Sequence, residues 1–288
     1  MQFGFSTYFL TNETLEGVID YILAAGVRVV ELSYEPPHLF SLDDRLIEKL
    51  RSLKDRGVSF SMHGPFLEIN LGSYLDEIRQ VSRERVLAAL ELSAKIGADP
   101  VVVHPGYSFF RKLKGYDREL QTRFLEDLKV VAEEARRLGV RVALENIFMS
   151  YFYFQELTEF AAIREAVPGI GVTLDIGHAY ISKRTAKQPE PEETILDDVR
   201  RMGIENLFHV HLHNNDGTRD DHDFVKGSID MAKVLHGLKE LGYEGKVIIE
   251  TLDIDRSGFP AVLEKLRTIM PLRAGSGGSK SLQHPYPE

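Results

Sequence analysis

The sequence predicts a single domain of the α/β class, a parallel eight-stranded (β/α)8 or TIM barrel. Short apolar runs of strand length recur eight times along the chain, with amphipathic helical stretches between them. Most of these helical stretches end at a glycine, the usual left-handed helix terminus, just before the next apolar run. Alternating strands and helices build a parallel sheet, and 288 residues suit one closed barrel.

The first four strands are expected in the N-terminal half of the chain. The opening segment MQFGFST supplies the first, and the next three lie in AAGVRVVELS, DRGVSFSMHG and KIGADPVVVHPG. In each of these three segments a glycine precedes an apolar run that is typical of a buried parallel strand. The stretch SRERVLAALELSAKIG has apolar residues three and four positions apart, which predicts a helix packed against the barrel.

The last four strands follow the same pattern. They are expected in RLGVRVALEN, PGIGVTLDIGH, LFHVHLH near residue 207 and ELGYEGKVIIET. The stretch TRFLEDLKVVAEEARRLG predicts another amphipathic helix. A doubly wound open sheet is the alternative arrangement of such units. No G-x-G-x-x-G motif follows the first strand, which disfavours a dinucleotide-binding sheet.

Residues 1–272 are therefore expected to form the barrel domain. The remaining segment, 273–288, reads RAGSGGSKSLQHPYPE, is rich in glycine and serine, and has no apolar period. We expect it to be a flexible tail or a remnant of an expression vector.

Composition excludes several classes of function. The hydrophobic content of 43% and charged content of 27% are those of an ordinary globular protein. The absence of cysteine excludes disulfides, thiolate metal ligands and a cysteine nucleophile. A net charge of −9 disfavours a surface that binds nucleic acid everywhere, although it allows a local basic patch. No signal peptide or membrane-spanning run is visible, so we expect a cytoplasmic protein without a membrane partner.

A potential metal ligand stands at the end of nearly every expected strand. These residues are Glu31, His63, His104, Glu145, Asp175, His211 to His213 and Glu250. The carboxyl ends of barrel strands converge on one face, where barrel enzymes build their active sites. One such residue alone is usually a turn former or a satisfied core residue, but so many together would repel or be poorly solvated without cations. The pattern predicts a metal centre for zinc, manganese or iron.

Further candidate ligands follow the last strands. His178 comes three residues after Asp175, and Asp220 with His222 forms a D-x-H pair after the seventh strand. The full candidate set is His63, His104, Glu145, Asp175, His178, His211, Asp220, His222 and Glu250. Nine ligands exceed the need of one ion and suffice for two or three, with Glu145 as a bridge. Two-ion clusters are typical of phosphoryl-transfer hydrolases.

The ordered motifs HGPFLEINLGS, VVVHPG, ALEN, LDIGHA, HLHNND…DDH and IIET resemble the endonuclease IV branch of the xylose isomerase-like barrels, also called AP endonuclease family 2. The resemblance spans nearly all of residues 1–270. It implies three zinc sites: His63, His104 and Glu145; Glu145, Asp175, His211 and Glu250; and His178, Asp220 and His222. It also implies that a metal-bound hydroxide attacks a phosphodiester, either at an abasic site in DNA or in a smaller molecule.

Two loops depart from the family pattern, and a second function stays open. LENIFMSYFYF has an aromatic run where the family has small residues, and only Gly227 remains of the G-x-G that usually follows D-x-H. Sugar or sugar-phosphate isomerases and epimerases of the same superfamily share four of the ligands. In those enzymes one ion polarises the substrate, and Glu145 and Glu250 would transfer protons here. That mechanism does not need the other ligands, so a multi-metal hydrolase is expected first and an isomerase or epimerase is the alternative.

Candidate substrate contacts surround the expected ligands. They are Glu31, for which pairing with a nearby base is the alternative, Tyr107, Arg111 and His213. The segment YSFFRKLKGY offers Arg111, Lys112 and Lys114 as a basic patch for DNA, or is an ordinary loop entering a helix. FMSYFYF predicts either an apolar lid or packing against the barrel.

The alternate histidines of the seventh strand point to the same face, because side chains of a strand alternate. His211 is expected to be the metal ligand of this strand, although His213 is the other candidate. His209 is expected one layer deeper, bonded to Ser61 or Thr173.

Overall fold

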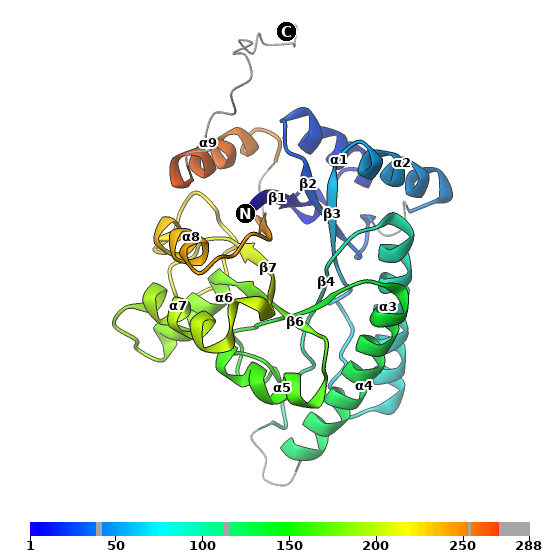
Figure 1. The fold of residues 1–288 in the computed structure, drawn as a ribbon, viewed down its shortest axis with the longest axis vertical. Helices are drawn as coiled ribbons and strands as arrows, with labels where there is room; N and C mark the ends of the chain where they lie inside the picture. The colour runs from blue at the N-terminus through cyan, green and yellow to red at the C-terminus, as the bar shows by residue number, and fades with distance from the viewer. Residues whose placement is uncertain (39–41, 112–115, 253–254, 271–288) are drawn as a thin grey trace, which may run out of the picture.

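Eight parallel strands form a closed barrel in chain order, which confirms the expected fold (Figure 1). The computed structural model describes residues 1–38, 42–111, 116–252 and 255–270. The strands are β1 (Gln2–Ser6), β2 (Val29–Ser33), β3 (Ser59–His63), β4 (Val101–Val103), β5 (Val142–Glu145), β6 (Gly171–Asp175), β7 (Leu207–Leu212) and β8 (Lys246–Ile249). Each coincides with an apolar run expected to be a strand.

Helices surround the barrel and cover its outer face (Figure 1). They are α1 (Leu15–Ala24), α2 (Asp44–Asp55), α3 (Asp76–Ile96), α4 (Asp117–Leu138), α5 (Phe160–Ala166), α6 (Ile176–Thr185), α7 (Pro191–Met202), α8 (Met231–Glu240) and α9 (Phe259–Ile269). Short 3-10 helices are η1 (Thr7–Leu10), η3 (Leu157–Glu159) and η4 (Ile204–Asn206). Both α3 and α4 end at glycines, Gly97 and Gly139, whose φ angles of 76° and 71° terminate the helix as expected.

The register of the strands sets the height of each side chain in the barrel. Across β6 and β7, Asp175 pairs with His211, so the carboxylate and the imidazole lie at the same level. Across β2 and β3, Glu31 pairs with Ser61, two residues before the end of β3 at His63. The side chains of Asp175 and His211 therefore lie in one layer of the barrel. Glu31 lies in the layer below, at the level of Ser61.

The expected tail, 273–288, lies outside the described residues. Within the described part of the chain, no helix combines the length and the apolar character that a membrane span requires.

Candidate metal centre

A cavity of about 440 Å³ opens at the carboxyl ends of the strands. Seven of the nine expected ligands line it: His63, His104, Glu145, His178, Asp220, His222 and Glu250. The other two, Asp175 and His211, are fully buried beneath this surface. The strand ends thus bring the expected ligand set to one side of the barrel, around a cavity large enough for a small molecule.

Short-range structure fixes several ligands before any ion is present. His63, Glu145 and Asp175 are the final residues of β3, β5 and β6. Asp175 also caps helix α6, because its Oδ1 accepts a hydrogen bond of 2.6 Å from the backbone amide of His178. This cap places His178 in the first turn of α6, directly above the strand end.

The first donor group consists of His63, His104 and Glu145. Glu145 Oε2 lies 3.1 Å from His104 Nε2 and 3.5 Å from His63 Nε2. The second group consists of Glu145, Asp175, His211 and Glu250. In it, His211 Nδ1 lies 3.4 Å from both Glu145 Oε1 and Glu250 Oε2. The two oxygens of Glu145 thus face different groups, which is the arrangement of a bridging carboxylate.

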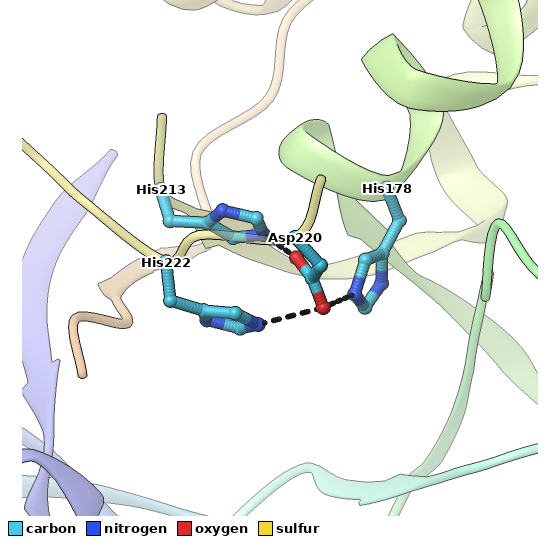
Figure 2. A group of neighbouring side chains, drawn as sticks. All are labelled: His178, His213, Asp220 and His222. Atoms are coloured by element: carbon cyan, nitrogen blue, oxygen red, sulfur yellow. Dashed lines mark hydrogen bonds and ion pairs between the residues drawn. The ribbon is translucent and has the colours of Figure 1, made fainter. Parts of the chain in front are cut away.

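The third donor group contains His178 of α6 with Asp220 and His222, which belong to the loop that follows β7 (Figure 2). Asp220 Oδ2 is 3.2 Å from His178 Nε2 and 3.2 Å from His222 Nε2. The loop returns toward β7 where Asn214 N donates to Asp223 O. The D-x-H pair and His178, which are distant in sequence, therefore meet as the resemblance implies.

The chemistry of these residues fits bound cations. Buried polar atoms normally have hydrogen-bond partners, yet several here have none among the described residues. They include Glu145 Oε2, Asp175 Oδ2, Asp220 Oδ1 and His211 Nδ1. Nitrogen and carboxylate donors of this kind suit zinc or manganese. We infer that divalent cations satisfy these atoms.

In the absence of cations, protons on the buried side chains must offset the repulsion between the donor atoms. Burial opposes ionisation of Glu145, but the charges of His104 and His211 outweigh it and hold its pKa well below the usual value. Burial also disfavours charged His63, yet the hydrogen bond and charge of Glu145 raise the pKa of His63 to about 9. Burial raises the pKa of Glu250. Metal binding therefore has to displace the proton from His63, whereas burial lowers the pKa of His104 and leaves its ring neutral.

Glu31 lies beneath the centre and pairs there with histidine rings, which is the alternative to its expected contact with substrate. It is fully buried and does not line the cavity formed by the described residues. Its Oε1 is 3.0 Å from His211 Nε2, and its Oε2 accepts a hydrogen bond from Ser61 and pairs at 2.7 Å with His209 Nε2. The expected partners of His209 were Ser61 or Thr173; instead Glu31 joins His209 and Ser61. A carboxylate behind a ligand imidazole orients that ring.

His213 lies behind the cavity wall, and its contact with substrate stays a prediction. It is fully buried and, in the described structure, does not line the cavity. Its ring stacks on His222, with centroids 3.9 Å apart and planes 12° apart. His211 faces the Glu145 group, whereas His213 faces Asp220, with 3.6 Å from Nε2 to Oδ1. Each of the two competing strand-7 candidates thus belongs to a different donor group.

The expected basic patch receives little support. Arg111 lies 3.5 Å from Glu159 and 3.9 Å from Asp117, and its guanidinium lies 5.6 Å from the ring centroid of Tyr153. Its charge is therefore compensated within the fold, and it is not among the described residues that line the cavity. Lys112 and Lys114 lie outside the described residues. Tyr107, by contrast, does line the cavity.

The aromatic run after β5 is divided between the two expected roles. Met149 and Phe152 line the cavity, as a lid would require. Phe154 is fully buried and packs against Phe160, and Tyr153 stacks on Phe124 in the core. The segment therefore anchors itself in the fold and presents only part of its length to the cavity.

Sequence reasoning missed most of the cavity wall. Its apolar part includes Phe66, Leu67, Ile69, Leu71, Ile147 and Leu252, and its hydroxyls include Ser6, Tyr8, Ser33 and Thr251. The hydroxyl oxygens of Ser33 and Thr251 are buried and lack a hydrogen-bond partner among the described residues. Both follow a strand-end pattern, but a single serine or threonine there gives no distinct signal.

Comparisons with known proteins agree with this fold. The family model described as xylose isomerase-like TIM barrel matches residues 19–269. Two uncharacterised proteins of Methanocaldococcus jannaschii are each 29% identical over 88% of this chain, covering 85% and 94% of their own lengths. A probable endonuclease 4 of Thermotoga maritima is 24% identical, covering 60% of this chain and 61% of its own.

Among solved structures, a D-tagatose 3-epimerase-like protein is 28% identical, with a TM-score of 0.78 over 93% of this chain and 98% of that chain.

Proposed function

The chain belongs to the xylose isomerase-like TIM barrel family, and from this premise we propose that it is a divalent-metal-dependent phosphoesterase acting on a small phosphodiester. The observation that carries the proposal is the donor group of His178, Asp220 and His222, together with His63 and His104. A single-ion isomerase needs only Glu145, Asp175, His211 and Glu250. Burying additional imidazoles and a carboxylate costs free energy unless they bind something.

The bound ions, Glu145 and Glu250 would have different roles in phosphodiester hydrolysis. Bound ions would activate water and neutralise charge on the phosphoryl oxygens. Glu145 presents one oxygen to each of the first two donor groups, so it holds their spacing. Glu250 lines the cavity and directs Oε2 toward His211, which leaves Oε1 to accept a proton from the attacking water.

The cavity favours a small substrate over DNA. Its volume of about 440 Å³ is within the range of small-molecule pockets, roughly 300–1,000 Å³. A DNA enzyme needs cations around its mouth, and Arg111 is already paired with Glu159 and Asp117. Much of the wall is apolar, as Phe66, Leu67 and Ile69 illustrate. We therefore favour a phosphodiester with an apolar substituent over abasic DNA.

An isomerase or epimerase of sugars or sugar phosphates is the second candidate. It is supported by the Glu145, Asp175, His211 and Glu250 group and by the similarity to a D-tagatose 3-epimerase-like protein. In that case Glu145 and Glu250 would transfer protons between neighbouring carbons. The mostly apolar wall argues against it, because a polyol requires many hydrogen-bonding groups.

Metal analysis combined with one substitution separates the two functions. Protein purified without chelator should contain about three ions per chain. His222→Ala should lower hydrolysis of a model phosphodiester such as bis(p-nitrophenyl) phosphate by about 100-fold or more, because one ion is lost. An epimerase would keep most of its activity toward ketohexoses. His236 is an exposed residue of α8, so His236→Ala is the matched control. It should change neither hydrolysis nor epimerisation.

One ion per chain, together with ketohexose epimerisation that survives His222→Ala, would overturn the proposal in favour of the epimerase. A duplex with one abasic site tests the DNA substrate separately, and we expect no nicking.

A further inference from the structure

A fourth side chain, His213, joins the donor group around Asp220 (Figure 2). We propose that His213 is a fourth protein ligand of the ion held by His178, Asp220 and His222. Four protein ligands would then hold the ion, and the ion would fix the loop after β7 in place beside the cavity. The inference rests on the proposed function, because it requires an ion at this position.

The ligand atoms lie within 4.8 Å of one another, and three of their distances are close to those of a tetrahedral zinc site. Zinc bonds of about 2.0–2.1 Å place the ligand atoms of a tetrahedron roughly 3.3 Å apart. Asp220 Oδ2 is 3.2 Å from the Nε2 atoms of His178 and His222, and Asp220 Oδ1 is 3.6 Å from Nε2 of His213. Figure 2 shows the carboxylate between the three rings.

Burial assigns His213 to the ion rather than to substrate. Its side chain is fully buried, whereas His178, Asp220 and His222 line the cavity. The ring stacks parallel to that of His222, and the Nε2 atoms of the two rings lie 3.6 Å and 3.2 Å from the Asp220 carboxylate oxygens. Asp220 Oδ1, the atom that faces His213, is buried and lacks a hydrogen-bond partner among the described residues.

The fold makes room for His213 at the expense of a helical residue. Gly177 lies in the first turn of α6, and a Cβ there would lie 2.0 Å from Cε1 and 2.3 Å from Nε2 of His213. Glycine is less favourable than alanine within a helix. The imidazole thus occupies the space that any other side chain at position 177 would fill.

A fourth protein ligand would give this ion a structural task in addition to its effect on hydrolysis. Zinc with four protein ligands is typically structural, whereas catalytic zinc keeps a position open. The four donors come from α6, the end of β7 and the following loop. The carbonyl of His222 also accepts a hydrogen bond from Leu252, which lines the cavity. An ion here would therefore hold one wall of the cavity.

The structure also supports a second role for His213, as a hydrogen-bond partner of Asp175. His213 Nε2 lies 3.1 Å from Asp175 Oδ1, to which it can donate a hydrogen bond. In that role His213 would position Asp175 without touching the ion. The two roles cannot use the same nitrogen at once.

A crystal structure of the zinc-loaded protein decides between them. We expect an anomalous peak with His213 Nε2 at about 2.0–2.1 Å. A zinc held by His178, Asp220, His222 and a water, with His213 on Asp175, would overturn the inference and leave the proposed function standing. No ion beside Asp220 would overturn both.

A substitution gives an independent readout in solution. His213→Gln keeps an amide N–H near the position of Nε2, so it can still donate to Asp175, but it is a poor zinc ligand. In the Co²⁺-loaded protein, we expect loss of the intense four-coordinate visible band and at least tenfold weaker binding of the third ion. Gly177→Ala, which displaces the ring, should do the same. His236→Gln, on the exposed face of α8, is the matched control. An unchanged spectrum and affinity in His213→Gln would overturn the inference.

Discussion

Single carboxylates organise this centre by facing more than one imidazole. Glu145 lies between His104 and His211, and Asp220 lies between His178 and His222. Each carboxylate can thus tie together ligands from distant parts of the chain. Glu31 has the same role one layer deeper, where it joins His211, His209 and Ser61.

Glu31→Gln should weaken metal binding without removing a ligand. The loss of negative charge behind His211 lowers the basicity of its ring and frees its orientation, so we expect about 10–100-fold weaker binding at the Glu145, Asp175, His211 and Glu250 group. Chelator competition measures this affinity. Glu240→Gln, on the surface of α8, is the control and should have no effect. Unaltered affinity in Glu31→Gln would show that Glu31 does not support His211.

Helix α6 connects the centre to the outer layer. Its first turn carries His178, and its last turn carries Lys183, which pairs with Asp198 of α7 at 2.6 Å and with Glu156 before η3. The side chains of Lys183 and Asp198 are only 9% and 5% exposed. This buried pair holds α6 against α7 and so fixes the helix that presents His178.

Lys183→Met should lower the free energy of unfolding by about 2–4 kcal/mol, because it leaves the buried Asp198 with only the exposed Arg201, 3.7 Å away, as a partner. The double variant Lys183→Met/Asp198→Leu should recover much of this loss, since a buried ion pair can be replaced by apolar side chains at little cost. Urea unfolding of both variants measures the difference. A single-variant loss below about 1 kcal/mol would contradict a structural role for the pair.

Taken as one molecule, the barrel concentrates titratable groups at one end, and its stability should therefore depend on protons when metal is removed. Burial opposes the charged form of His178, but Asp175 and Asp220 raise its pKa to about 10, and Glu145 raises that of His63 to about 9, both from 6.5. The folded, metal-free protein thus holds protons that the unfolded chain releases near neutral pH.

The metal-free protein should be more stable at pH 6.5 than at pH 9. A histidine whose pKa is higher in the folded state stabilises the fold below its unfolded pKa, and this contribution disappears as the pH rises through the folded value. For His63 and His178 that range runs from 6.5 to between about 9 and 10. Urea midpoints of chelator-treated protein measure the effect.

The same comparison on metal-loaded protein should show a smaller decrease, because cations replace the protons. An equal or higher midpoint at pH 9 in the metal-free protein would contradict the prediction.

The sequence alone determined the eight strands, their order and the face on which the candidate ligands gather. These depend on local periodicity and on glycine-terminated helices such as α3 and α4, which a linear pattern records. It also identified His63, His104, Glu145 and the other donors, because polar residues at the ends of apolar runs are visible without a structure.

Only the tertiary structure decided which donor faces which. His211 and His213 are indistinguishable in sequence, since His213 continues the alternation of the strand that ends at Leu212. Their partners come from β2, β5 and the loop at Asp220, whose approach depends on strand register and on the return of that loop. The inward position of Glu31 is decided in the same way, because contacts across some 180 residues of chain, such as the one between Glu31 and His209, exist only once the barrel has closed.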